Sequence, residues 1–253
     1  MLQVQNLSVR YGNAQILKNV SFDLQEGQWL MIAGPNGAGK STAIAAISQT
    51  TDYTGKVLIR GQDASKMKSS QRAKEIGVLM QKHSPGFSFT VEEVVRLGRY
   101  AYAPSPFSSR DRDDEKVFEQ AVRMTGIENI LHQSVLTVSG GELQRTFLAQ
   151  LLNQNPRIMI LDEPANHLDL KYQKQIFDVI REWLKTPGRA VVSVVHDLSL
   201  ARAYGTDALL MNRGETVVKG KIGDVMKDES LSEVYEMNVR EWMQGLLNQW
   251  KDA

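Results

Sequence analysis

The residues from Gly34 to Thr42, GPNGAGKST, have the types and spacing that cradle a chain of phosphates. They meet the pattern G-x-x-x-x-G-K-[ST], between the apolar run WLMIA and the helical stretch AIAAIS. Glycines let backbone N–H groups turn inward around a β-phosphate, and the start of the helix adds the positive end of its dipole. We expect Lys40 to reach the β- and γ-phosphates, Ser41 to bind Mg²⁺ and Thr42 to support the α-phosphate. The strand, loop and helix setting disfavours the alternative, a glycine-rich turn that fits by chance.

Two carboxylates end a second apolar run, RIMILDEP. Asp162 is expected to hold magnesium, directly or through water, and Glu163 to polarise the water that attacks the phosphate. Burying both carboxylates without a cation is costly, so a purely structural interpretation has to find partners for each. A third run, VVSVVHDLS, ends at His196, which could contact the γ-phosphate from the carboxyl edge of a sheet. Alone, such a histidine is more often a core or capping residue, but the neighbouring motifs favour the phosphate contact.

The elements that must position these residues alternate along the chain. Short β-rich runs at 29–34, 56–60, 157–162 and 190–196 are separated by longer helical patterns, which predicts βαβ units and a largely parallel, buried sheet. The segment 171–184 has apolar residues on one helical face and ends before a Pro-Gly pair. It is expected to be an amphipathic helix that covers the sheet.

The β-rich runs disappear between about Pro85 and Pro156, where the pattern predicts helix, polar loop and helix. We therefore expect one domain over residues 1–253, with an α/β core formed by 1–84 and 157–253 and an all-helical insert at about 85–156. The most loop-like segment is APSPFSSRDRDD, residues 103–114.

Composition excludes several classes of protein. Lys and Arg number 30 against 29 for Asp and Glu, a net charge of +1, so non-specific binding to nucleic acid is disfavoured. The absence of cysteine excludes disulfides and thiolate metal sites and fits a reducing compartment. The first twelve residues alternate polar and apolar side chains, which predicts a strand and not a signal peptide. No apolar run is long enough to cross a bilayer, so any work at a membrane is expected to go through a partner.

The order of five motifs resembles the nucleotide-binding subunit of ATP-binding cassette (ABC) transporters over nearly the whole chain. The motifs are GPNGAGKST, GVLMQKH with Gln81, VSGGELQR, RIMILDEPANHLDL and SVVHDLS. The resemblance implies a P-loop NTPase (RecA-like) core with a helical insert and an N-terminal antiparallel β region, and ATP and Mg²⁺ as cofactors. The ATP-binding residues would be Tyr11, Gly34, Pro35, Asn36, Gly37, Ala38, Gly39, Lys40, Ser41, Thr42, Ser139, Gly140, Gly141 and Glu142.

The Ser-Gly-Gly of the third motif gains a role through this resemblance. Ser139, Gly140 and Gly141 would begin a helix that binds the γ-phosphate held by the other protomer of a homodimer. A capped helix end suits a phosphate, and two such chains would bury two ATP molecules with C2 symmetry. From the residues alone, a plain helix cap is favoured, with Ser139 as N-cap and Glu142 three residues on. Both interpretations can hold at once.

Three further roles are implied by the same family. Tyr11 matches the aromatic residue that stacks on adenine, although a tyrosine after a strand is by itself more often ordinary packing. Gln81 would touch the magnesium and the attacking water and link the site to the insert. Asp169 would cross the dimer interface. Two positions depart from the family pattern, Val138 for leucine and Ala165 for threonine, and neither change removes a catalytic group.

The stretch TVEEVVRLGRYAY, residues 90–102, and the tail LSEVYEMNVREW are similar to importer ATPases that serve iron-siderophore, haem and vitamin B12 permeases. Alternatively, the helix within 90–102 could simply pack its apolar side. The residues after Gly98-Arg99 are Tyr-Ala-Tyr where the iron-complex pattern has proline and histidine, which leaves the cargo open.

The implied partners are integral membrane permease subunits, an extracytoplasmic binding protein and a second copy of the chain, with no nucleic acid. The implied location is the cytoplasm, at the inner face of the cell membrane through the permease. The rivals are the ATPase of another ABC transporter, or a soluble cassette ATPase that acts on nucleic acid or the ribosome. The second rival is disfavoured because the chain has no second cassette, coiled coil or basic extension.

The C-terminal segment has Met243, Leu246, Leu247 and Trp250 on one face of a short helix. This face could contact a second protomer or a membrane surface, but little basic charge accompanies it. We expect it instead to fold back onto its own domain.

Overall fold

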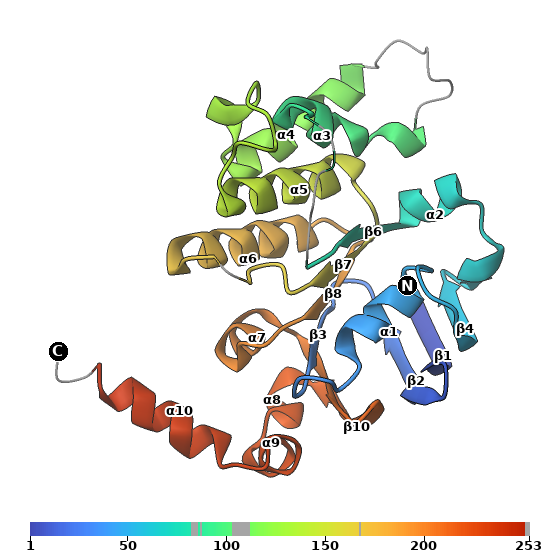
Figure 1. Cartoon of the computed structure of the whole chain (residues 1–253), viewed down its shortest axis with the longest axis vertical. Helices are drawn as coiled ribbons and strands as arrows, with labels where there is room; N and C mark the ends of the chain where they lie inside the picture. The colour runs from blue at the N-terminus through green and yellow to red at the C-terminus, as the bar shows by residue number, and fades with distance from the viewer. Residues whose placement is uncertain (82–85, 87, 103–111, 167, 251–253) are drawn as a thin grey trace.

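The computed structural model describes residues 1–81, 86, 88–102, 112–166 and 168–250. Two sheets form its centre, with the helical insert above them and the C-terminal helices below (Figure 1). The first sheet is antiparallel, in the order β2-β1-β4-β5. Its strands are β1 (Leu2–Tyr11), β2 (Ala14–Leu24), β4 (Thr54–Ile59) and β5 (Gln62–Asp63).

The second sheet has six strands in the order β10-β9-β3-β8-β7-β6, and only β10 is antiparallel to its neighbour. The strands are β3 (Trp29–Ala33), β6 (Ile76–Leu79), β7 (Ile158–Asp162), β8 (Ala190–Val194), β9 (Asp207–Asn212) and β10 (Glu215–Lys221). Every residue of β3, β7 and β8 is buried, because the sheet is covered on both faces. Trp29 and Met31 pack on one face, and Leu30 and Ile32 on the other.

The strands predicted at 29–34, 157–162 and 190–196 are confirmed as β3, β7 and β8 of the parallel sheet. The run at 56–60 also lies in a strand, β4, but this strand pairs antiparallel with β1. Its assignment to the parallel sheet was wrong. The apolar pattern of a strand reports burial, and it does not encode which strand is its neighbour.

Between β6 and β7 the described residues form helices joined by turns. The helices are α3 (Val91–Leu97), α4 (Arg112–Thr125) and α5 (Gly140–Gln154), with short 3₁₀ turns at Tyr100–Tyr102 and Glu128–Ile130. This is the helical insert that the sequence predicted. Of the loop predicted at 103–114, residues 103–111 lie outside the described residues, and the last three begin α4 instead, where three acidic residues suit the start of a helix.

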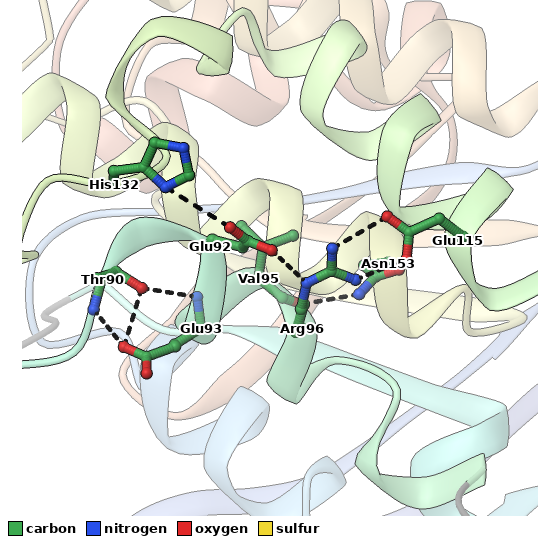
Figure 2. A network of polar contacts seen from close by, with 8 residues as sticks. All are labelled: Thr90, Glu92, Glu93, Val95, Arg96, Glu115, His132 and Asn153. Atoms are coloured by element: carbon green, nitrogen blue, oxygen red, sulfur yellow. Dashed lines mark hydrogen bonds and ion pairs between the residues drawn. The ribbon is translucent and has the colours of Figure 1, made fainter. Parts of the chain in front are cut away.

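Polar contacts bind the three helices of the insert into one unit (Figure 2). Arg96 of α3 pairs with Glu92 at 2.7 Å and, through two nitrogens, with Glu115 of α4 at 2.9 and 3.0 Å. The fully buried Asn153 of α5 donates from Nδ2 to the carbonyl of Val95 at 2.8 Å. The helix α3 is therefore bonded to both of its neighbours, α4 and α5.

The amphipathic helix predicted at 171–184 is α6 (Leu170–Leu184). Its apolar face packs on the sheet, with Ile176, Val179, Ile180 and Trp183 buried and Leu184 half-buried. The remaining elements are α1 (Lys40–Ile47), a 3₁₀ turn at Ala64–Lys66, α2 (Ser69–Glu75), α7 (Leu198–Tyr204), α8 (Ile222–Val225), α9 (Asp228–Tyr235) and α10 (Val239–Asn248). None of the helices in the described ranges is both long enough and apolar enough to span a membrane.

The C-terminal helix α10 departs from expectation. Met243 packs against the core, but Leu246, Leu247 and Trp250 are 50%, 60% and 79% exposed. Glu236, at φ 55°, is the C-cap of α9; Val239 at the start of α10 is buried in the core, and the rest of the helix extends away from it (Figure 1). The prediction that this apolar face folds back onto the domain is therefore confirmed for Met243 and wrong for Leu246, Leu247 and Trp250.

Candidate active site

The phosphate loop connects β3 to α1, and its backbone geometry depends on glycine. Gly37 and Gly39 have φ 79° and 92°, and Gly39 is the N-cap of α1. Gly34 has φ 148°, and a Cβ at this position would lie 2.1 Å from the carbonyl oxygen of Met211. The loop therefore turns tightly under the N-terminus of a helix, with its backbone free to approach a ligand. This is the shape that a phosphate chain requires.

Lys40 begins α1 and is 6% exposed. Its Nζ donates to the carbonyl oxygens of Gly34 at 2.8 Å and Pro35 at 2.9 Å, so the amino group lies over the loop. Burial lowers the pKa of Lys40, and the negative charges of Glu163 and Asp162 oppose that shift. The ammonium group is thus poorly solvated beside two carboxylates, where its field acts strongly on any added phosphate.

Asp162 ends β7 and is 2% exposed. Its Oδ1 accepts a hydrogen bond from Ser41 Oγ at 3.2 Å. Burial raises the pKa of Asp162 and the neighbouring Glu163 adds to that shift, against the hydrogen bond from Ser41 and the charges of Lys40 and His196. A buried carboxylate next to a hydroxyl is an oxygen donor set that suits Mg²⁺, which also relieves the cost of burying the charge.

Glu163 follows β7 in the left-handed region, at φ 52°, which is uncommon for a residue other than glycine. Three side chains hold its carboxylate. His196 Nε2 lies 2.6 Å from Oε1, and the amides of Gln81 and Asn166 each donate to Oε2 at 2.6 Å. The structure thus brings Glu163, His196 and Gln81 together from three separate segments of the chain.

Asn166 is the member of this group that sequence reasoning missed. Its backbone N–H also donates to the carbonyl of Glu163 at 3.1 Å, so the two residues close a turn directly after β7. The signal was present in the sequence, since an amide side chain three residues after a carboxylate can reach back across a turn.

The Ser-Gly-Gly stretch begins α5 with a capping box. Ser139 Oγ accepts from the N–H of Glu142 at 3.3 Å, and Glu142 Oε2 accepts from the N–H of Ser139 at 2.8 Å and from its hydroxyl at 2.7 Å. These bonds from Ser139 lower the pKa of Glu142. The helix-cap interpretation is therefore confirmed. Ser139 and Gly140 are exposed, and no atom lies within 4 Å of a Cβ added at Gly140, so this helix end is open to an approaching group.

The two remaining predicted site residues lie at the surface. Tyr11, at the end of β1, is 52% exposed, and its hydroxyl lies 3.2 Å from Thr51 Oγ1, so the ring does not pack in the core. Asp169 is the N-cap of α6 and accepts from the N–H of Tyr172 at 3.0 Å. The next residue, Leu170, is 83% exposed.

The two departures from the family pattern occupy apolar surroundings. Val138 packs against the core of the insert. Ala165 is 6% exposed and lines a hollow of about 110 Å³ behind Glu163, together with Phe177 and Leu200. Neither side chain touches the carboxylate of Glu163 through a polar atom, so both substitutions leave its hydrogen bonds in place.

The family model for ABC transporters matches residues 17–166. The chain belongs to the ABC transporter family. A hemin import ATP-binding protein of Pseudomonas fluorescens (strain Pf0-1), HmuV, is 37% identical over 245 residues, which cover 94% of each chain. The ferric enterobactin transport ATP-binding protein FepC of Escherichia coli (strain K12) is 32% identical over 92% of this chain and 86% of its own length. An uncharacterized ABC transporter ATP-binding protein of Bacillus subtilis (strain 168), YvrA, is 36% identical over 94% of this chain, which spans only 54% of that relative.

Solved structures give the same fold. The ATP-binding cassette MJ0796, in a dimeric post-hydrolysis state with ADP and Pi, has a TM-score of 0.76 at 26% identity, over 88% of this chain and 99% of that one. An inward-facing ABC transporter of metal-chelate type has a TM-score of 0.79 at 23% identity, over 94% of this chain and 89% of that one. The predicted fold class of this ABC ATPase, a P-loop NTPase with a helical insert and an antiparallel N-terminal sheet, is confirmed.

Proposed function

We propose that this ABC ATPase hydrolyses MgATP in a homodimer and uses dimer closure to drive a membrane permease that imports a metal chelate. The observation that carries the proposal is the convergence on Glu163 of Gln81, Asn166 and His196, beside Lys40 and the Ser41–Asp162 pair. A base, a metal-binding pair and a phosphate loop within one cluster are the parts of a phosphoryl-transfer site.

ATP is proposed to bind along the loop 34–42, with its adenine on the exposed ring of Tyr11 and its γ-phosphate near Lys40 and His196. Ser41, Asp162 and Gln81 would hold Mg²⁺. Bound Mg²⁺ would polarise phosphoryl oxygens and neutralise charge on the β- and γ-phosphates. The buried Asp162, whose pKa burial raises, supports this assignment because its charge has no salt-bridge partner within the described residues.

Glu163 is the proposed general base. Water attacks the γ-phosphorus in line with the bond between that phosphorus and the β,γ-bridging oxygen. This bond breaks, the bridging oxygen leaves as part of ADP, and the proton of the water passes to Glu163. A carboxylate has about four lone-pair sites, and three are engaged by His196, Gln81 and Asn166. The three donors therefore fix the orientation of the remaining site, and Lys40 stabilises negative charge that develops on the phosphates.

The second half of the site is proposed to come from another copy of the chain. Ser139, Gly140 and Gly141 would cover the γ-phosphate held by the partner's loop, and Asp169 would cross the interface. The exposure of the α5 N-terminus and of Leu170 supports this arrangement. A two-fold axis would then give two identical ATP sites, as the dimeric state of the similar cassette MJ0796 suggests.

The permease is proposed to contact the surface around residues 82–102. Residues 82–85 and 87 lie outside the described residues, but Leu97 and Tyr100 are 48% and 76% exposed on the insert. The bonds from Arg96 and Asn153 would carry a push on α3 to α5. The names of the relatives HmuV and FepC, a hemin importer and a ferric enterobactin transporter, support a metal-chelate cargo and an extracytoplasmic binding protein. The chain would then lie in the cytoplasm at the inner face of the membrane, with residues 85–156 as its moving subdomain.

The experiment is to tag the chain, express it in its own cells, solubilise the membranes gently and identify what copurifies by mass spectrometry. A polytopic membrane protein, with or without a binding protein, is expected. Recovery with ribosomes or nucleic acid in the soluble fraction would overturn the transport assignment while leaving the ATPase chemistry intact. MgATP-dependent dimerisation of Glu163→Gln, with Ser139→Arg as control, tests the dimer separately. A dimer that forms equally well in the control would overturn the role given to α5.

A further inference from the structure

Arg145, in the second turn of α5, is a buried charge with an unusual set of partners. It is 9% exposed, and within the described ranges no carboxylate lies at ion-pair distance from its guanidinium. Its Nη1 donates to the carbonyl oxygens of Thr125 at 3.2 Å and Gly126 at 2.8 Å, at the C-terminal end of α4. Its Nε is buried without a hydrogen-bond partner among the described residues. The charge of Arg145 is therefore stabilised by the carbonyl groups at the end of α4 and by the group that packs on the flat face of the guanidinium.

The group that covers it is the ring of Tyr172, in the first turn of α6. The guanidinium carbon lies 4.7 Å from the ring centroid, within the range of a cation–π contact, which is stronger where water is excluded. The backbone N–H of the same Tyr172 donates to Asp169 Oδ1 at 3.0 Å. One residue thus connects Arg145 of α5 to the cap of α6.

The start of α5 also lies against this part of the chain. A Cβ added at Gly141 would sit 3.5 Å from Leu168 and 4.0 Å from Tyr172, so the helix packs there at ordinary van der Waals distance. Gln144, one turn on, donates from Nε2 to the carbonyl oxygen of Pro164 at 2.9 Å. The N-terminal half of α5 and the segment before α6 are therefore bound to each other within one chain, with Tyr172 at the centre of the contact.

We propose that Tyr172 is a positioning residue that, through Arg145, fixes the Ser139 end of α5 relative to Asp169, so that each chain presents both elements to its partner as one rigid surface. This inference rests on the proposed homodimer. Ser139 and Asp169 are the two groups expected to reach across the interface, and holding their spacing before the chains meet lowers the entropic cost of ordering them on association. Neither Ser139 nor Asp169 makes a polar contact with the ring of Tyr172, so the ring affects their relative position and not their hydrogen bonds.

The test measures the dimer dissociation constant of the Glu163→Gln chain in saturating MgATP by sedimentation equilibrium. Adding Tyr172→Leu is expected to weaken the dimer by about threefold to tenfold; because the contact with Arg145 lies within one chain, its full strength, about 1.4 kcal/mol or tenfold, is the upper limit of the effect. Tyr172→Phe, the matched control, keeps the ring and is expected to stay within about twofold of the parent. The affinity of the single, dilute chain for MgATP should be unchanged in both, because the loop 34–42 makes no contact with Tyr172.

A double-mutant cycle distinguishes a role of Tyr172 in positioning Ser139 and Asp169 from a general loss of stability of the chain. In the parent, the effects of Ser139→Ala and Asp169→Asn on the dissociation constant are expected to be non-additive, and in the Tyr172→Leu background they should add. An unchanged dimer with Tyr172→Leu, an equal loss with Tyr172→Phe, weaker MgATP binding by the single chain, or the same coupling in both backgrounds would each overturn the inference. A parent that stays monomeric in MgATP refutes the proposed dimer, and the inference with it.

Discussion

Replacement of Glu163 by glutamine preserves the size of the side chain and turns one carboxylate oxygen into an amide nitrogen. The carboxylate accepts hydrogen bonds of 2.6 Å from His196, Gln81 and Asn166. Glutamine can keep the two bonds at Oε2 through its single oxygen. Its NH₂ group then faces His196, which has to present an unprotonated Nε2. Because a neutral imidazole can accept at that nitrogen, we expect the Glu163→Gln chain to fold with the cluster intact but without a base.

The size of the effect follows from what the variant loses. A general base contributes about 10²–10⁴ to a rate, so kcat for ATP hydrolysis should fall by that factor. Lys40 and the Ser41–Asp162 pair make no hydrogen bond to the replaced atom, so the affinity for MgATP should change little. The assay is phosphate release at saturating MgATP, with nucleotide binding measured separately by fluorescence.

The control for this prediction is Asn166→Ala, which removes one of the three donors and keeps the base. Loss of a hydrogen bond to a charged group corresponds to about 1.5–3 kcal/mol, but this bond is present before the reaction as well as during it, so only part of the loss enters kcat, which should stay within about tenfold of the parent. A Glu163→Gln chain that keeps more than about a tenth of the parental kcat would refute the assignment of Glu163 as base. A larger loss in Asn166→Ala than in Glu163→Gln would refute it as well.

Three further predictions concern caps, glycines and the insert. Ser139 holds the pKa of Glu142 below its ordinary value of 4.5, so the stability that these hydrogen bonds contribute to the folded chain is present above that pH and is lost as the pH falls through the lower folded pKa. Ser139→Ala should therefore lower the melting temperature at pH 7 and lower it much less in acid. An equal fall at both pH values would contradict the argument. Gly34→Ala should abolish ATP binding or folding, since its Cβ would lie 2.1 Å from a carbonyl oxygen. Gly140→Ala, with no atom within 4 Å of its Cβ, should melt with the parent and bind ATP as a single chain. Equal melting temperatures together with equal ATP binding in the two variants would contradict the loop geometry. Arg96→Met removes two partly exposed ion pairs, with Glu92 and Glu115, and should cost about 0.4–2 kcal/mol, a fall in melting temperature of about 1–8 °C; no fall would show that the two pairs do not hold the insert.

The parts of the site that lie at strand ends could be predicted from the sequence because their position follows from local patterns. Asp162, Glu163 and His196 each end an apolar run, and parallel strands bring their carboxyl ends to one edge of a sheet. The loop at 34–42 carries its own geometry, since only glycine suits the positive φ angles and the approach at Gly34. These features needed no knowledge of distant contacts.

What could not be predicted depends on partners far along the chain or on orientation. The run at 56–60 has the composition of a buried strand, but its antiparallel partner is β1, more than fifty residues earlier in places, and composition does not specify that choice. The apolar pattern of α10 predicts a buried face, yet Leu246, Leu247 and Trp250 are exposed, and the pattern does not encode the direction in which the chain leaves α9. Asn166 differs from these two cases, because its place three residues after Glu163 was a signal in the sequence, although its bond to Glu163 depends on the turn after β7.

The helix-cap role and the phosphate-binding role of Ser139 compete for the one proton of its hydroxyl group. Its hydroxyl donates to Glu142 at 2.7 Å in the capping box, and it cannot donate to a phosphate at the same time. Under the proposed function, closure of the dimer therefore exchanges one charge-assisted hydrogen bond for another and brings the carboxylate of Glu142 near a γ-phosphate of the same sign. The net gain at this residue is small, so it falls to the helix N–H groups and to the rest of the interface to hold the closed state. Under the proposed function, an N-terminus of α5 built in this way would favour a dimer that ATP closes and hydrolysis opens.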